Sequence, residues 1–156
     1  MNHPKFMPTL IENAGEAFMQ SLSRIVEDDQ SFNEKSLSGE LITRFGEALE
    51  AASGEACRTG LKEFIESQDA VSESVVEGGK KHNFKMVISK PFLSRFGVIE
   101  ISRRAYYHWR KSPGLFPLDQ KMDMVGRYVM PDVVEFLLYG AGKLTPKELE
   151  GMFQAL

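Results

Sequence analysis

The chain has 156 residues, 42% of them hydrophobic and 26% charged, a composition that supports a folded core and excludes an intrinsically disordered protein. No apolar run approaches the ~20 residues of a membrane-spanning helix, and the N-terminus lacks the apolar segment of a secretory signal. Cys57 is the only cysteine and the three histidines are scattered, which excludes an internal disulfide and leaves no zinc-binding set. We therefore expect a cytoplasmic protein that holds no metal or cofactor and does not enter a membrane.

The net charge of −3 conceals an uneven distribution. Residues 1–79 contain 6 Lys and Arg against 15 Asp and Glu, residues 80–111 contain 9 against Glu100 alone, and residues 112–156 contain 4 against 6. Positive charge concentrated within an acidic chain favours an anionic partner, with nucleic acid the first candidate. The alternative is a hairpin that its lysines keep soluble, as in many edge strands.

Two helical patterns occupy the first part of the chain. Residues 9–12 form a capping box, and apolar residues at helical spacing predict an amphipathic helix over residues 9–27. A second pattern covers residues 38–67 and contains three glycines that allow a kink or a division into two helices: Gly46, Gly54 and Gly60. The apolar stripes predict that the helices pack on one another or on a partner, including a second copy of the chain.

The apolar period then changes from 3.6 to 2. Residues 68–79 are polar and are interpreted as a linker, and a strand begins at Asn83 and is ended, or placed at a sheet edge, by Pro91. A turn over residues 94–97 follows, with Gly97 at positive φ. One face of the returning strand carries Ile99, Ile101, Arg103, Ala105, Tyr107 and Trp109, and the other carries Glu100, Ser102, Arg104, Tyr106 and His108. We expect a two-stranded antiparallel ribbon whose apolar face, including Tyr107 and Trp109, packs on helices.

The C-terminal part reads as two short helices. Residues 111–114 form a turn, residues 116–119 close the basic segment, and residues 120–130 are irregular. One helix begins at Pro131, and a capping box at residues 145–148 starts another that reaches about residue 155. The pair is similar to the first two helices of a helix-turn-helix unit, although two helices joined by a tight turn occur in most helical domains.

The expected fold is mainly α with a small antiparallel β-ribbon (α+β). It consists of an acidic helical region over residues 1–77, a basic β-hairpin segment over residues 78–120, and a C-terminal helix pair over residues 121–156.

Four short motifs in order resemble the N-terminal region of bacterial insertion-sequence transposases of the DDE type. They are Arg95-Phe96-Gly97-Val98, the run from Ser102 to His108 (SRRAYYH), Phe116-Pro117-Leu118-Asp119 and Pro131-Asp132-Val133. The resemblance covers roughly residues 75–156 and implies DNA binding and a part in DNA recombination. Two departures stand out. The interval over residues 109–116 lacks the cysteine pair of many relatives, and the chain ends at Leu156, before the third helix and the catalytic domain that the family pattern places further on.

No catalytic constellation accompanies these motifs. Phosphoryl transfer by two metals needs carboxylates brought together from separate elements. Asp119, Asp123 and Asp132 fall instead at loop and helix-start positions that structural roles explain, and no phosphate-binding glycine loop is present. We therefore expect a chain that is not itself an enzyme.

The functional hypothesis is a non-catalytic DNA-binding and assembly portion of a transposase-like protein. The expected DNA contacts are Lys80, Lys81, Lys85, Lys90, Arg95, Arg104, Tyr106, His108, Arg110 and Lys111. The alternative is an oligomerisation or regulatory fragment that does not bind nucleic acid. In that case the basic ribbon pairs with the acidic helices, with Arg103 as a candidate for such a pair.

Overall fold

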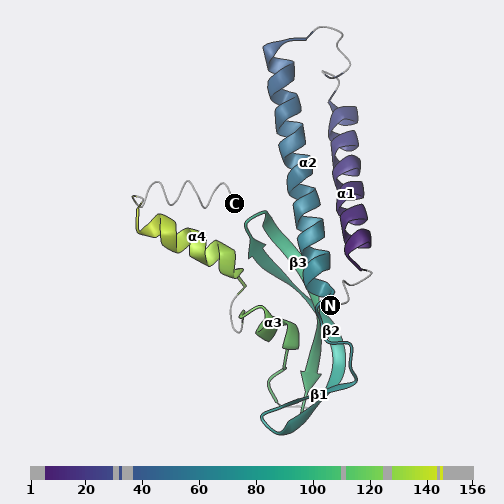
Figure 1. Cartoon of the computed structure of the whole chain (residues 1–156), viewed down its shortest axis with the longest axis vertical. Coiled ribbons are helices and arrows are strands. Elements are labelled where there is room, and N and C mark those ends of the chain that lie inside the picture. The colour runs from purple at the N-terminus through teal and green to yellow at the C-terminus, as the bar shows by residue number, and fades with distance from the viewer. Residues whose placement is uncertain are drawn as a thin grey trace. The chain divides into compact units, whose positions relative to one another are not determined.

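The computed structural model describes residues 6–29, 32, 37–109, 112–124, 128–143 and 145. Four helices and one three-stranded antiparallel sheet make up this part of the chain (Figure 1), which confirms the mainly-α, α+β expectation. The elements are α1 (Phe6–Asp28), α2 (Gly39–Glu66), β1 (Ser74–Glu77), β2 (Lys80–Ser94), β3 (Gly97–Tyr107), α3 (Pro117–Lys121) and α4 (Pro131–Ala141). Two compact units divide the chain within α2, at residue 63. The sequence had predicted this boundary at residue 77, where the acidic region gives way to the basic segment.

The first unit is an antiparallel hairpin of α1 and α2. The Asn13 amide donates to the Glu63 carboxylate at one end of the hairpin, and Arg44 pairs with Asp29 at the other. The two predicted helices are confirmed with one correction: α1 begins at Phe6, so the expected cap Thr9 lies inside the helix. Because α1 already has a turn before Thr9, the capping-box pattern does not mark the start of this helix.

The second unit is built around the sheet, in the order β1-β2-β3. Residues 74–77, predicted as part of a linker, form β1 and pair with residues 80–83. The intervening glycines have φ values of 55° and 74°, a conformation that glycine adopts without strain and that closes a two-residue hairpin turn. The second turn has the predicted form, with Gly97 at φ 99° and the Ser94 hydroxyl donating to the Gly97 carbonyl.

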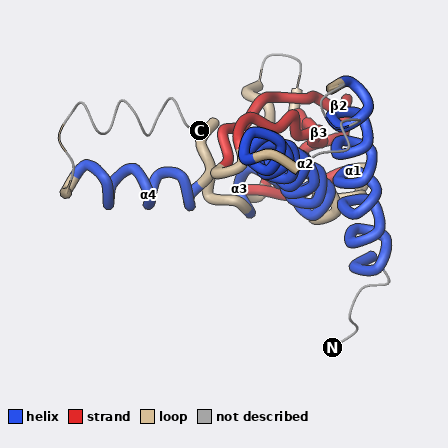
Figure 2. Tube along the Cα trace, turned by 90° about the horizontal axis from the view of Figure 1, so that it is seen from above, coloured by secondary structure: helices blue, strands red, loops and turns tan. Residues whose placement is uncertain are grey.

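One face of the sheet forms the core of this unit. Ile99, Ile101 and Ala105 of β3 are buried there, as predicted, together with Phe92 of β2. Leu118 of α3 and Met124, Met130 and Val133 are also buried. Helix α3 contacts β3, and α4 contacts β2 and then extends away from the sheet (Figures 1 and 2). A β-bulge between Phe84 and Met86 shifts the register between β2 and β3.

Both outer edges of the sheet are occupied by other segments. On β2, the Leu93 N–H donates to the Tyr128 carbonyl and the Leu93 carbonyl accepts from Met130. The N–H groups of successive strand residues point alternately to opposite neighbours. Pro91, two residues before Leu93, therefore faces the same outer edge as Leu93, and its lack of an N–H group costs no hydrogen bond to β3.

On β3, three successive outward N–H groups have acceptors. Ser102 donates to the Glu66 carboxylate at 2.6 Å, Arg104 donates to the Asp69 carboxylate at 2.7 Å, and Tyr106 donates to the Leu115 carbonyl at 2.9 Å. Unpaired edge strands invite pairing with another chain. The side chains of Glu66, the last residue of α2, and of Asp69 therefore close part of this edge, and the Leu115 carbonyl closes the next position.

Tyr106 holds the segment between α2 and β1 in place. Its side chain is fully buried, its ring contacts Phe84, and its hydroxyl lies 2.9 Å from the Ala70 carbonyl and 3.0 Å from the Ser72 carbonyl. The prediction that Tyr106 contacts DNA is therefore wrong for this structure. Alternation placed Tyr106 on the polar face, but that face is covered here by residues 70–73.

Helix α4 begins at Pro131 as predicted and ends at Ala141. The second helix of the predicted C-terminal pair falls outside the described residues.

We predict that Tyr106→Phe lowers the free energy of unfolding by about 1–3 kcal/mol, because it leaves buried carbonyl groups without their donor. Urea denaturation of the full chain measures this change. Tyr107→Phe is the matched control, since the structure gives that hydroxyl no hydrogen bond among the described residues, and it is expected to change stability by less than about 0.5 kcal/mol. Equal effects of the two changes would contradict this role for Tyr106.

Candidate nucleic-acid interface

Five of the predicted DNA contacts are exposed cations on β2 and the turn that follows it. They are Lys80, Lys81, Lys85, Lys90 and Arg95. None of them forms an ion pair with a described residue. Two approach aromatic rings: Lys90 lies 5.6 Å from the Tyr128 ring centroid and Arg95 lies 5.9 Å from that of Phe96. Neither contact is an ion pair, although Arg95 shares a pocket with Asp132 and Glu135 of α4.

These cations do not share one face of the sheet. Successive side chains of a strand point to opposite faces, so Lys80 and Lys81 flank the strand on both sides. A strand of 15 residues extends over about 46 Å, and Arg95 lies at the end opposite to Lys80. The positive charge therefore follows the ribbon along its length, with its densest part just after the β1–β2 turn.

Two histidines lie beside this turn. The rings of His82 and His108 are 5.7 Å apart, and His108 Nδ1 lies 2.8 Å from the Lys81 carbonyl oxygen. His108 is exposed, so its ring remains accessible next to the lysines. Of the predicted contacts, Arg110 and Lys111 lie outside the described residues.

Arg104 and Trp109 differ from expectation in opposite ways. The Arg104 guanidinium carbon lies 4.2 Å from the Phe84 ring centroid and the residue is half-buried, so part of this predicted contact is already covered. Trp109 was assigned to the core but is 61% exposed. Since β3 ends at Tyr107, the strand alternation used for that assignment does not extend to Trp109.

Arg103 occupies the covered face of the sheet and pairs within its own unit. Its Nε lies 2.7 Å from the Asp119 carboxylate of α3, and its guanidinium carbon lies 5.1 Å and 4.6 Å from the ring centroids of Phe92 and Phe116. Only 3% of Arg103 is exposed. The hypothesis of a pair with the N-terminal helices is therefore wrong for Arg103: the polar residue that broke the apolar alternation has a partner in the Pro-Leu-Asp motif.

Asp119 has an altered acidity in this environment. Burial raises the pKa of its carboxyl above the ordinary range for aspartate, and the nearby Asp69 adds to the increase, while Arg103 opposes it. Arg103 Nη1 is buried and has no hydrogen-bond partner among the described residues. The attraction between Arg103 and Asp119 therefore offsets only part of the free energy that is lost when their two charges are removed from water.

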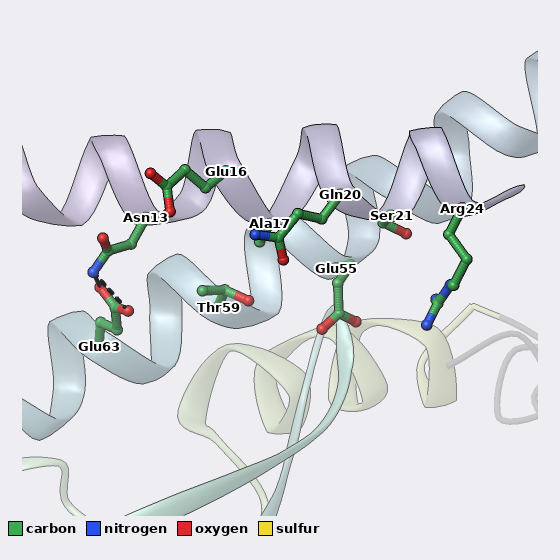
Figure 3. A pocket seen from close by; sticks show the side chains of 9 residues that line it. All are labelled: Asn13, Glu16, Ala17, Gln20, Ser21, Arg24, Glu55, Thr59 and Glu63. Atoms are coloured by element: carbon green, nitrogen blue, oxygen red, sulfur yellow. Dashed lines mark hydrogen bonds between the residues drawn. The ribbon is translucent and has the colours of Figure 1, made fainter. Parts of the chain in front are cut away.

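The helical hairpin has a separate polar groove of about 590 Å³ (Figure 3). Asn13, Glu16, Gln20 and Arg24 of α1 and Glu55, Thr59 and Glu63 of α2 line it. Its carboxylates make it unsuitable for phosphate. In the described part of the chain, no group of three or more His, Cys, Asp or Glu side chains is arranged to hold a metal ion.

Comparisons of the chain with protein-family models, curated proteins and solved structures return no match. None of the described helices has the length and apolar character to span a membrane.

We predict that Arg103→Met lowers the free energy of unfolding by about 3–5 kcal/mol, because it leaves the Asp119 carboxylate buried without a cation. The double variant Arg103→Met/Asp119→Leu should lose markedly less, since it removes both charges together. Chemical denaturation of the two single variants and the double variant gives the coupling energy. An additive cycle would show that the two side chains do not act as a pair.

A second prediction concerns pH. A carboxyl whose pKa is higher in the folded state binds protons more readily when folded, so its stabilising contribution is present at low pH and decreases as pH rises. The stability of the wild type relative to Asp119→Asn should therefore fall as pH rises from about 4, the ordinary pKa of aspartate, through the raised value. Urea denaturation across this range measures the difference. A difference that grows with pH would show that Arg103 dominates and lowers the pKa.

Proposed function

We propose that this protein binds DNA through its phosphate backbone, using the exposed cations of β2 and the turn that follows it. The observation that carries the proposal is that Lys80, Lys81, Lys85, Lys90 and Arg95 are all exposed and without an ion pair among the described residues. Contacts between such side chains and phosphates provide most of the sequence-independent affinity for DNA.

The ribbon geometry supports this mode of binding. The β1–β2 turn is a tight two-glycine connection, followed directly by Lys80 and Lys81. It lies at one end of the sheet (Figure 1), where the Gln120 side chain of α3 donates to the Glu77 carboxylate and His108 approaches the Lys81 carbonyl. The major groove of B-DNA, about 12 Å wide, admits a two-stranded ribbon, and lysines on both faces of it would meet phosphates on both sides.

The positions of the nearby carboxylates also favour an external partner for the lysines. Glu66 and Asp69 accept from backbone N–H groups of β3, and Asp119 pairs with Arg103. These acidic groups therefore have other partners within the unit. An anion from outside the chain remains the natural counterpart of the exposed cations.

In this proposal the chain binds and does not catalyse. The resemblance to the N-terminal region of insertion-sequence transposases supports a role in DNA recombination, in which the catalytic residues are supplied by a domain that the family pattern places further along the chain. Among the described carboxylates, Asp132 lies in the first turn of α4 and Asp119 is paired with Arg103, and neither position suggests a metal-dependent active site.

Duplex DNA binding by the full chain, measured by fluorescence anisotropy over a series of salt concentrations, tests the proposal. Five phosphate contacts give a slope of log K against log salt of about −4.5. The triple variant Lys80→Ala/Lys81→Ala/Lys85→Ala should reduce the size of this slope by about 3, similarly for all duplex sequences.

The matched control removes three positive charges elsewhere, with Arg24→Ala/Lys62→Ala/Lys143→Ala. It changes the net charge equally and should leave the slope close to that of the wild type. No binding by the wild type at low salt, or equal losses in the two triple variants, would overturn the proposal.

A further inference from the structure

Two of the three histidines come together at the end of the sheet near the β1–β2 turn, although they lie far apart in the sequence. Asn83 of β2 pairs with Tyr107 of β3, and the next residues outward along the two segments are His82 and His108. Residues opposite each other on antiparallel strands project from the same face, with Cβ atoms about 5 Å apart. The two imidazole rings accordingly have centroids 5.7 Å apart.

Both rings use the same nitrogen to contact the backbone. His82 Nδ1 lies 3.0 Å from the Lys80 carbonyl oxygen, and His108 Nδ1 lies 2.8 Å from the Lys81 carbonyl oxygen. A carbonyl oxygen only accepts hydrogen bonds, so each Nδ1 is the protonated nitrogen of its neutral ring. Nε2 then carries the lone pair in both rings, and no described residue forms a hydrogen bond with either Nε2 atom.

This pattern of hydrogen bonds is the one that prepares a histidine to bind a metal ion. A ligating imidazole commonly donates its other N–H to a backbone carbonyl, which fixes the tautomer and the orientation of the ring. Since Nδ1 and Nε2 point in nearly opposite directions, an Nδ1 that faces the backbone leaves Nε2 facing away from it. His108 is exposed and His82 is half-buried, so both lone pairs can be reached from solvent.

The separation of the rings also fits a shared ion. With a metal–nitrogen bond of about 2.1 Å, an ion lies about 3.2 Å from each ring centroid, and a tetrahedral ion holds the two centroids about 5.2 Å apart. The observed separation of 5.7 Å is about 0.5 Å longer. Small rotations of the two side chains remove this difference.

We propose that His82 and His108 together bind a divalent transition-metal ion that favours imidazole ligands, such as Zn²⁺, through their two Nε2 atoms. Two protein ligands are fewer than the three or four of catalytic and structural zinc sites. Water or an anionic group from outside the chain would therefore complete the coordination, and the ion would bind reversibly.

The neighbouring charges permit a cation at this position. Lys80 shares a face of the sheet with His82, and Glu77 lies opposite Lys80 in the strand register. Lys80 is exposed and carries its charge on a flexible four-carbon stem, so its ammonium group can lie away from the ion. The two imidazoles, by contrast, are held by their hydrogen bonds to the backbone.

Calorimetric titration of Zn²⁺ into the full chain, without an affinity tag, tests this proposal. The starting protein is Cys57→Ser, which removes the only thiol, and it should bind one ion per chain. His82→Asn and His108→Asn are made in this background, because the asparagine amide N–H can still donate to the carbonyl but has no counterpart of Nε2. Each should weaken Zn²⁺ binding by at least about tenfold.

His3→Asn is the matched control, since it removes the remaining histidine and should leave the affinity unchanged. Mg²⁺, which prefers oxygen ligands, should not compete. Electron paramagnetic resonance of bound Cu²⁺ gives a second measurement: it should detect two imidazole nitrogens in the starting protein and one in each of the His82→Asn and His108→Asn variants. No Zn²⁺ binding, an affinity that neither of these variants lowers, an equal loss in His3→Asn, or one ion shared between two chains would overturn the proposal. DNA enters none of these measurements, so the result is independent of the function proposed above.

Discussion

A single guanidinium group, that of Arg103, links the sheet to the segments that cover it. A cation removed from water needs both counter-charge and polarisable contact to offset the lost hydration. Here the Asp119 carboxylate of α3 lies 2.7 Å away, and two phenyl rings, one from β2 and one just before α3, lie within 5.1 Å of the guanidinium carbon. Three segments that are separate in sequence therefore meet at one side chain. The position of α3 against β3 depends on this contact together with the burial of Leu118.

The same unit uses carboxylates to complete its backbone hydrogen bonding. Glu66, the last residue of α2, and Asp69, three residues later, accept from alternate N–H groups along the outer edge of β3. On the other side of the sheet, residues 128–130 bond to β2. Glu66 and Asp69 are thus used by the backbone and Asp119 by Arg103, whereas Glu77, which lies opposite Lys80 in the strand register, accepts from Gln120.

The two units differ in the kind of partner that their surfaces suit. The sheet presents exposed cations along β2, whereas the hairpin presents exposed apolar side chains and a polar groove lined by carboxylates.

The sequence by itself determined the two long helices, the hairpin turn at Gly97, the start of α4 and the burial of Ile99, Ile101 and Ala105, because these depend on local periodicity and on residues with special backbone preferences. Tertiary structure decided the rest. Residues 74–77 became a strand because residues 80–83 offered a partner, and Tyr106 became buried because residues 70–73 cover the face that alternation had marked as polar. Trp109 became exposed because β3 stops at Tyr107. Arg103 found its counter-charge in Asp119, 16 positions away, which no pattern of neighbouring residues could indicate. Periodicity shows which side chains share a face, but only the packing of segments distant in sequence decides which face is covered and which charges are neutralised.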